Sequence, residues 1–135
     1  MAKLKVEIVT PEKRVLSVQA DEVIVPGARG LFGVRPGHTP FLSLMEPGWM
    51  TLKDGATSQR YYLAGGFVEV ASDQVRILAD QAESEAEVDV DAAKKRLADA
   101  QNTLKGMSPD DVRFQVEAAT VRRETARITG LGHRA

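Results

Sequence analysis

The stretch FVEVASDQVRILA, residues 67–79, decides the architecture of this chain of 135 residues. Apolar and polar residues alternate on both sides of Ser72-Asp73, and the apolar positions hold Val, Ile, Leu and Phe. Alternation with a period of two is typical of strands that bury one face, and a Ser-Asp pair between two such runs is typical of a turn. The stretch therefore predicts a β-hairpin with one face in a core.

Similar short runs fill the chain before this hairpin, separated by turn residues such as Pro26-Gly27 and Asp54-Gly55. Together with the hairpin, the predicted strands are residues 3–9, 15–18, 21–25, 31–34, 41–45, 49–53, 59–63, 67–70 and 75–78. One flat sheet of about nine strands would leave an apolar face in water. The sequence therefore predicts a β-sandwich or flattened barrel.

The pattern changes near residue 88, where Ala, Lys, Asp and Gln become frequent. Apolar residues then recur at three- and four-residue steps, as on one face of a helix, at Val90, Ala93, Leu97, Ala100 and Leu104. Asp89 is placed to cap this helix and Gly106 to end it. Ser108-Pro109 predicts the start of a second helix that ends before Gly130. The fold class is therefore α+β, with a β-sandwich domain over residues 1–86 and an antiparallel helical hairpin over residues 87–135.

The predicted seam of the second helix is shallow. Ala, Val and Thr fill most of its positions, and Arg123 interrupts the stripe Val112, Val116, Ala119 and Ala126. Each buried CH₂ contributes about 0.8 kcal/mol, so small residues in place of Leu remove several kcal/mol of docking energy. We expect the hairpin to be marginally docked and able to leave the β domain.

Composition excludes several functional classes. The chain has no Cys and only two His, which excludes disulfides, thiolate zinc sites and cysteine nucleophiles. Its apolar runs are far shorter than a membrane span, and residues 1–7 contain no targeting segment. The segment from Val112 onward contains five Arg and only two Glu. This excess of positive charge is too small for a nucleic-acid-binding surface but suits contact with an acidic protein surface.

Two candidate catalytic or ligand-binding motifs have structural alternatives. The glycines of residues 25–40 lack the Lys-Ser/Thr pair and following helix of a phosphate loop, so they predict turns and bulges. His38 with Asp21 is the only candidate pair for a small hydrolase, and no nucleophile elbow accompanies it.

Three further motifs are also open to a structural explanation. Gly65-Gly66 predicts a close approach of two backbones. The alternating carboxylates Glu83, Glu85, Glu87, Asp89 and Asp91 are expected to face water rather than a metal. Arg122, Arg123 and Arg127 share one surface of the second helix, as either a solvated face or a binding face.

Several linked segments resemble the epsilon subunit family of bacterial and chloroplast ATP synthases, in order, spacing and length. The segments are GLFGVRPGHTP (30–40), EPG (46–48), GGFVEV (65–70) and ILADQAE (77–83). The resemblance implies a non-enzymatic subunit of the central stalk, held by the gamma subunit and the membrane rotor ring of c subunits, that couples proton flow to ATP synthesis. It also implies a peripheral location on the cytoplasmic face of the bacterial membrane, or on the thylakoid membrane.

The resemblance also assigns surfaces. A loop with Leu31, Phe32, Arg35 and His38 would face the rotor ring, and one sheet face would lie against gamma. The hairpin would be compact or extended, and when extended Arg122, Arg123 and Arg127 would contact the alpha and beta catalytic subunits and inhibit ATP hydrolysis, through charge-assisted hydrogen bonds.

Some family members bind ATP through an aliphatic-Asp-x-x-Arg-Ala motif. Asp89 and Ala93 match it and Arg122 would contribute, but Ala92 stands where Arg is expected. The missing cation argues against ATP as a ligand, and no other cofactor is expected.

The alternative from the sequence pattern alone is a free-standing β-sandwich ligand sensor with a mobile helical hairpin. Co-purification with a multi-subunit ATPase distinguishes the two hypotheses.

Overall fold

A computed structural model describes residues 2–131; Met1 and residues 132–135, the last four of the predicted helical domain, lie outside the described part. The described chain forms ten strands, a 3₁₀ helix and two α-helices. The strands are β1 (Leu4–Val9), β2 (Arg14–Ala20), β3 (Glu22–Gly27), β4 (Gly30–Val34), β5 (Phe41–Met45), β6 (Gly48–Asp54), β7 (Thr57–Leu63), β8 (Gly66–Ala71), β9 (Gln74–Ala79) and β10 (Ala82–Ser84). The helices are η1 (Glu85–Glu87), α1 (Val90–Lys105) and α2 (Phe114–Thr129).

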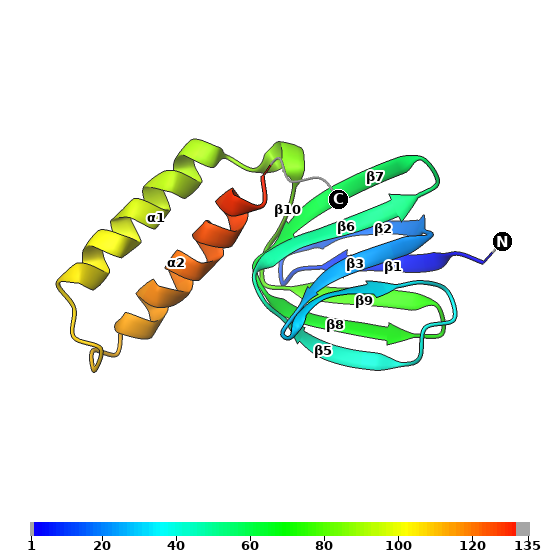
Figure 1. The fold of residues 1–135 in the computed structure, drawn as a ribbon, viewed down its shortest axis with the longest axis horizontal. Coiled ribbons are helices and arrows are strands. Elements are labelled where there is room, and N and C mark those ends of the chain that lie inside the picture. The colour runs from blue at the N-terminus through cyan, green and yellow to red at the C-terminus, as the bar shows by residue number, and fades with distance from the viewer. Residues whose placement is uncertain (1, 132–135) are drawn as a thin grey trace.

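The strands form one sheet in the order β10-β7-β6-β3-β5-β8-β9-β1-β2, with β4 paired to β3. The sheet folds back on itself so that its two halves face each other, and the two helices project from one end (Figure 1). The predicted sandwich followed by a helical hairpin is confirmed.

The core lies between the two halves of the sheet. Its alternating residues are fully buried on β1, β8 and β9, where Val6, Val68 and Ile77 lose all contact with solvent. Both residues of the Ser72-Asp73 turn have positive φ, 50° and 59°, as a tight hairpin turn requires. The hairpin predicted from residues 67–79 is confirmed.

The predicted close approach at Gly65-Gly66 is confirmed as well. Gly66 has φ +126°, and a Cβ added there would lie 2.0 Å from the carbonyl oxygen of Leu78 on β9. Only glycine fits this position.

The structure confirms the predicted limits of α1. The Asp89 carboxylate accepts a hydrogen bond of 3.0 Å from the Ala92 N–H, and Gly106 follows the last helical residue. Ala93 and Ala100 are buried on the predicted stripe.

The predicted start of α2 at Ser108 is wrong, because the helix begins at Phe114. Ser108 Oγ does accept a bond of 3.2 Å from the Asp110 N–H, as a cap would. The Asp111 carboxylate then accepts from the Arg113 N–H at 2.9 Å and pairs with the Arg113 side chain, which forms a second turn before the helix.

The predicted seam of α2 is also wrong in its first half. Val112 and Val116 are 89% and 62% exposed. A groove between the helices is lined instead by Leu104 of α1 with Phe114 and Val121 of α2.

The expectation that the acidic ladder faces water is wrong for Glu83 and Glu85. β10, which the sequence did not predict, pairs with β7 and brings Glu83 to Arg127 of α2. Glu85 lies 2.9 Å from Arg60 of β7. These partners are distant in sequence, so the local alternation of charge could not reveal them.

Candidate functional site

An apolar patch covers part of the outer face of the β5-β8-β9 sheet. The antiparallel register places Leu44 opposite Phe67 and Phe67 opposite Leu78, so the three side chains form a row across three strands. They are 57%, 49% and 47% exposed, and Leu42 lies two residues before Leu44 on the same strand face. We call these four residues the apolar sheet face. A contiguous exposed apolar patch is typical of a protein-binding surface, unlike single exposed residues.

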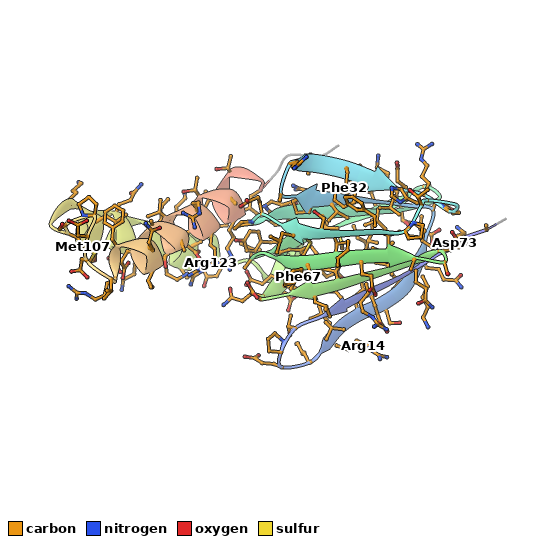
Figure 2. All side chains as sticks on the ribbon, turned by 90° about the horizontal axis from the view of Figure 1, so that it is seen from below. Arg14, Phe32, Phe67, Asp73, Met107 and Arg123 are labelled. Carbon is orange, nitrogen blue, oxygen red and sulfur yellow. The ribbon has the colours of Figure 1, made fainter. Side chains whose placement is uncertain are left out.

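The apolar sheet face ends against the hairpin on one side and against charges on the other. A cleft of about 360 Å³ is lined by Leu44 and Phe67 together with Ala119, Arg122 and Arg123 of α2. In Figure 2, Phe67 and Arg123 lie on either side of the boundary between sandwich and helices. In the other direction the same sheet carries ion pairs of Glu7 with Arg14 and Arg76. The surface is therefore apolar near the helices and ionic away from them.

The residues predicted to face the rotor ring lie at two ends of β4. Leu31 is 70% exposed beside the β3–β4 turn, where the Ala28 N–H bonds the Leu44 carbonyl at 2.9 Å, near α2. The Phe32 ring makes an edge contact with Phe41, with centroids 5.2 Å apart.

Arg35 and His38 follow the other end of β4. Arg35 pairs with Glu22 at 3.1 Å, and the His38 ring nitrogen Nδ1 lies 2.6 Å from the Thr39 carbonyl. The Gly37 N–H donates to the Asp73 carboxylate at 2.7 Å, which ties this loop to the β8–β9 turn. Asp73 lies at the end of the sandwich that is far from the helices (Figure 2). Since about 13 Å separates the ends of a five-residue strand, the four residues do not form one cluster.

The end of α2 docks on β6 and β7 through three donors from the sheet. The Trp49 Nε1–H donates to the Ala126 carbonyl at 3.1 Å, and the Tyr62 hydroxyl donates to the Arg123 carbonyl at 2.8 Å. Arg60 donates to the Gly130 carbonyl at 2.8 Å. The Ala126 carbonyl also accepts from the Gly130 N–H, whereas the Gly130 carbonyl lies beyond the last residue of α2, where a cation such as Arg60 suits the helix dipole. The sheet therefore holds the end of α2 through donors that add to the helix's own bonds.

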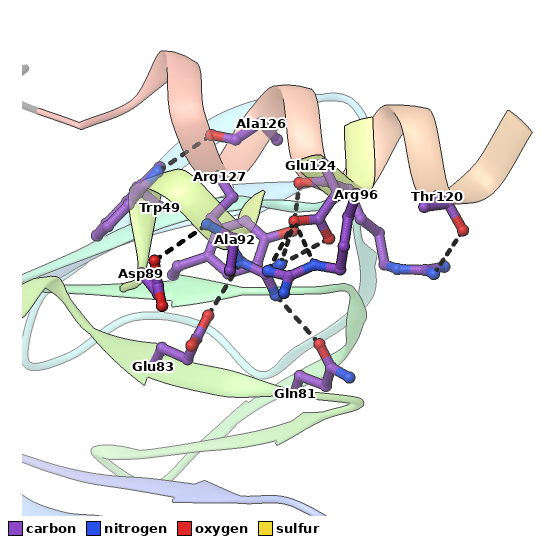
Figure 3. A network of polar contacts seen from close by, with 12 residues as sticks. Trp49, Gln81, Glu83, Asp89, Ala92, Arg96, Thr120, Glu124, Ala126 and Arg127 are labelled. Atoms are coloured by element: carbon purple, nitrogen blue, oxygen red, sulfur yellow. Dashed lines mark hydrogen bonds and ion pairs between the residues drawn. The ribbon is translucent and has the colours of Figure 1, made fainter. Parts of the chain in front are cut away.

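An ion-pair cluster lies beside these donors, and we call it the latch cluster: Gln81, Glu83, Arg96, Glu124 and Arg127 (Figure 3). The Arg127 guanidinium contacts Glu124 of its own helix at 2.6 Å and Glu83 of β10 at 2.9 Å. It also donates to Gln81 at 3.1 Å, while Arg96 of α1 reaches Glu124 at 3.1 Å. α2, β10 and the segment before β10 therefore meet at the Arg127 guanidinium, and α1 joins the cluster through Glu124.

Burial distinguishes Arg127 from the other two predicted inhibitory arginines. The side chains of Arg127 and Glu124 are both only 4% exposed, and the Arg127 guanidinium stacks 4.6 Å from the Tyr62 ring centroid. Arg122 is exposed and Arg123 is half-buried. The structure therefore places the three cations of one predicted face in three different environments.

The residues considered for ATP do not share a cleft. A cleft of about 610 Å³ is lined by Arg96, Arg123 and Arg127 along with Glu83 and Glu124. Neither Asp89 nor Ala93 lines it: Asp89 caps α1 and Ala93 is buried. Arg122 lines the smaller cleft beside Phe67. Arg96 and Arg127 in the cleft of about 610 Å³ already pair with carboxylates of the chain itself, while Arg123 donates to the Thr120 hydroxyl.

The two residues considered for hydrolysis have separate partners. Asp21 lies 2.8 Å from Lys3 and accepts from the Gly55 N–H at 2.6 Å. The bonds from Lys3 and Gly55 lower the pKa of the Asp21 carboxyl below its usual value. His38 meets the Thr39 carbonyl instead. Within residues 2–131, no helix combines the length and apolar character needed to cross a membrane.

Sequence reasoning missed the partners of Arg127. Glu83 and Glu124 are ordinary surface residues by pattern, and the single Trp, Trp49, lies in a predicted strand. One signal was available: α2 places Glu124 three residues before Arg127, a spacing that brings the two side chains together.

Comparison with protein families identifies a family model that matches more than half of the chain. The family model described as "ATP synthase, Delta/Epsilon chain, beta-sandwich domain" matches residues 3–85. An ATP synthase epsilon chain from Myxococcus xanthus (strain DK1622) is 66% identical over 128 residues, which cover 95% of this chain and 94% of that one. An ATP synthase epsilon chain from Anaeromyxobacter sp. (strain K) is 50% identical over 129 residues, 96% of this chain and 98% of that one.

Two solved structures share the fold. A chain in the Euglena gracilis mitochondrial ATP synthase, OSCP/F1/c-ring in rotational state 1, matches with a TM-score of 0.84 at 20% identity, over 97% of this chain and 82% of that one. A chain in the central stalk/c-ring structure of Tetrahymena thermophila mitochondrial ATP synthase matches with a TM-score of 0.66 at 17% identity, over 94% and 97%. Both likenesses extend over the sandwich and the helices.

Proposed function

Because the chain belongs to the epsilon family of ATP synthase subunits, we propose that it is a rotor subunit of the central stalk. In this role it couples rotation of the membrane ring to ATP synthesis and inhibits ATP hydrolysis through its helices. Epsilon chains are non-catalytic subunits, so the hydrolase hypothesis for His38 and Asp21 is set aside. The alternative of a free-standing ligand sensor depended on sequence pattern alone and loses its basis.

The apolar sheet face is the observation that carries the proposal. Three large apolar side chains form one row and are each about half exposed: Leu44, Phe67 and Leu78. When a partner covers these side chains, their removal from water contributes roughly 25 cal/mol of binding free energy per Å² of buried apolar surface. The gamma subunit is the proposed partner, and it would hold the sandwich to the rotating shaft.

The segment from the β3–β4 turn along β4, with Leu31 and Phe32, is the proposed contact with the ring of c subunits. Leu31 is its most exposed apolar side chain, and the Phe32–Phe41 pair supports it from the sheet. Arg35 and His38, beyond the other end of β4, belong to the same proposed contact, in which the ring surface extends along β4. The subunit would then be peripheral, on the cytoplasmic face of the bacterial membrane.

Inhibition of ATP hydrolysis is proposed to use the cationic surface of α2 against acidic segments of the alpha and beta subunits. Arg122 is already exposed and Arg123 is half-buried in the docked hairpin. Charge-assisted hydrogen bonds from arginine forks suit carboxylates on a partner. α2 docks only through its last turns, so its release breaks a small set of contacts.

Binding of the full-length chain to isolated cognate gamma subunit tests the proposal. Phe67→Asp places a charge at the centre of the apolar sheet face, and we expect it to weaken binding by about tenfold or more, as for a central interface residue. Val112→Asp is the matched control, because Val112 is 89% exposed on the other domain. Equal affinity of the Phe67→Asp and Val112→Asp variants would contradict the assignment of this face to gamma.

A further inference from the structure

The latch cluster is electrically balanced across the boundary between the domains. Glu83 belongs to the sandwich, Arg96 belongs to α1, and Glu124 and Arg127 belong to α2. Two cations and two carboxylates leave no net charge, and the two buried ions, Glu124 and Arg127, are each paired with an opposite charge, as buried ions require. Arg127 is the group between the two carboxylates, because it contacts Glu83 and Glu124 on either side.

Loss of Arg127 would therefore turn the electrostatic interaction between the sandwich and α2 from attraction into repulsion. Glu83 and Glu124 would face each other across the boundary without the cation that separates them, and like charges at close range repel. Arg96 would still pair with Glu124, but its side chain is half exposed and lies on the hairpin, so it cannot hold the hairpin to the sheet. Arg127 is also the only member of the latch cluster that stacks on Tyr62 of β7.

A second contact between the hairpin and the sandwich, that of Gly130 with Trp49, is possible only because Gly130 has no side chain. Gly130 follows α2 directly, and a Cβ added there would lie 2.0 Å from Trp49 Cδ1. Its φ of −79° is open to any residue, so the close approach of Trp49 is what restricts the position. Trp49 also bonds the Ala126 carbonyl, so indole and helix end fit directly against each other.

We propose that Arg127 is the latch that holds the hairpin on the sandwich, seated by the fit of Gly130 against Trp49, and is not itself a contact to the catalytic subunits. Arg127 and Arg122 then have opposite effects on inhibition. Arg127 keeps the hairpin docked and so limits inhibition, whereas Arg122 contacts the catalytic subunits and contributes to it. The inhibitory consequence rests on the proposed function, whereas the docking itself does not.

The test compares Arg127→Met with Arg122→Met in the full-length chain. Trp49 is the only Trp, so its emission and its quenching by acrylamide report the docked contact. We expect Arg127→Met to shift the hairpin by about tenfold or more toward the released state, with red-shifted and more quenchable emission. Arg122→Met, on the exposed part of the same helix, should leave Trp49 unchanged.

The same variants are then added to the cognate catalytic complex. Arg127→Met should inhibit ATP hydrolysis more strongly than the parent chain, and Arg122→Met less strongly. Unchanged Trp49 quenching in Arg127→Met would overturn the latch. Exposure of Trp49 with weaker inhibition would show that Arg127 is a contact to the catalytic subunits after all. Absence of inhibition by every chain, parent included, would count against the proposed function, and the fluorescence result alone would then decide the latch.

Two further measurements separate a latch from a general loss of folding. Glu83→Gln combined with Arg127→Met should release the hairpin less than the sum of the single effects, because the two residues share one contact. Gly130→Ala should also expose Trp49, while Gly106→Ala, at the equivalent end of α1 with open space around it, should not. Helical circular dichroism should be retained in all of them. Additive single effects, or equal behaviour of the two glycine variants, would refute the proposed contact.

Discussion

Tyr62 shows at the scale of one residue how docking depends on a proton. Its side chain is fully buried, and its hydroxyl donates to the Arg123 carbonyl at 2.8 Å. Burial raises the pKa of Tyr62 to about 12, and the nearby Arg127 guanidinium offsets part of that rise. The docked hairpin therefore requires the neutral phenol.

High pH should release the hairpin through this residue. A released Tyr62 loses its proton near its ordinary pKa of about 10, whereas the docked one keeps it to about 12. The docked state binds more protons in that interval, so its stability is complete below pH 10 and falls as the pH rises toward 12. Trp49 emission between pH 9 and pH 12 measures the release, and a Tyr62→Phe chain with the same pH profile would contradict it.

Gly66 lies where the sheet has no room for a side chain. A methyl group there would meet the Leu78 carbonyl at 2.0 Å, and the positive φ adds strain. We expect Gly66→Ala to destabilise the sandwich by about 3 kcal/mol, from overpacking and strain together. Gly55→Ala, with φ +60° but open space, should cost only about 1 kcal/mol. Urea unfolding compares the two, and equal midpoints would show that the close backbone approach has no energetic weight.

Single residues were predicted well where the cause is local. The Asp89 cap, the Gly106 end and the Ser72-Asp73 turn each follow from the residue and its neighbours. Arg127 was predicted only as a surface cation, because its burial depends on Glu83, which a different element supplies. A sequence pattern carries no information on that distance.

Elements were predicted with the correct type but not always the correct limits. α2 begins at Phe114, five residues after Pro109, the first helical position that Ser108-Pro109 indicates, since the Asp111–Arg113 turn intervenes. A start signal of this strength favours a helical turn, yet it does not fix which turn continues into the helix. The apolar stripe was predicted on Val112 and Val116, whereas Phe114 and Val121 line the groove against α1.

The corrected seam makes a prediction about hairpin stability. Val112→Gln and Val116→Gln should change the free energy of unfolding by less than about 0.5 kcal/mol, because both side chains are mostly in water. Phe114→Ala and Val121→Ala should each cost about 1–2 kcal/mol, since both are half-buried against α1. Thermal melting followed by helical circular dichroism provides the measurement. A larger loss from the Val112 or Val116 change would restore the stripe expected from sequence.

The whole molecule has two unequal parts. The sandwich encloses a large core of fully buried aliphatic residues, whereas α1 and α2 bury only Ala93, Ala100, Glu124 and Arg127 between them. Trp49, Tyr62 and Ala64 form a separate small cluster where α2 docks. The hairpin extends from one end of the sandwich and meets it chiefly through the end of α2 (Figure 1).

This asymmetry should appear in hydrogen exchange. The amides of α1 and α2 need only the docked contact and the helix seam to open, whereas the amides of β1, β8 and β9 need the core to unfold. We expect exchange in residues 90–128 to be faster than in those strands by about tenfold or more. Equal protection across both regions would contradict a hairpin that can be released.

The central claim, that the sandwich anchors the subunit and the hairpin acts as its releasable brake, is tested most directly by removing the hairpin. ATP hydrolysis by the cognate catalytic complex is measured with the full-length chain and with a chain ending at Glu87. We predict that the shortened chain competes with the full-length chain for the complex and leaves hydrolysis uninhibited. Inhibition by the shortened chain as strong as that by the full-length chain, or failure to compete, would contradict the account.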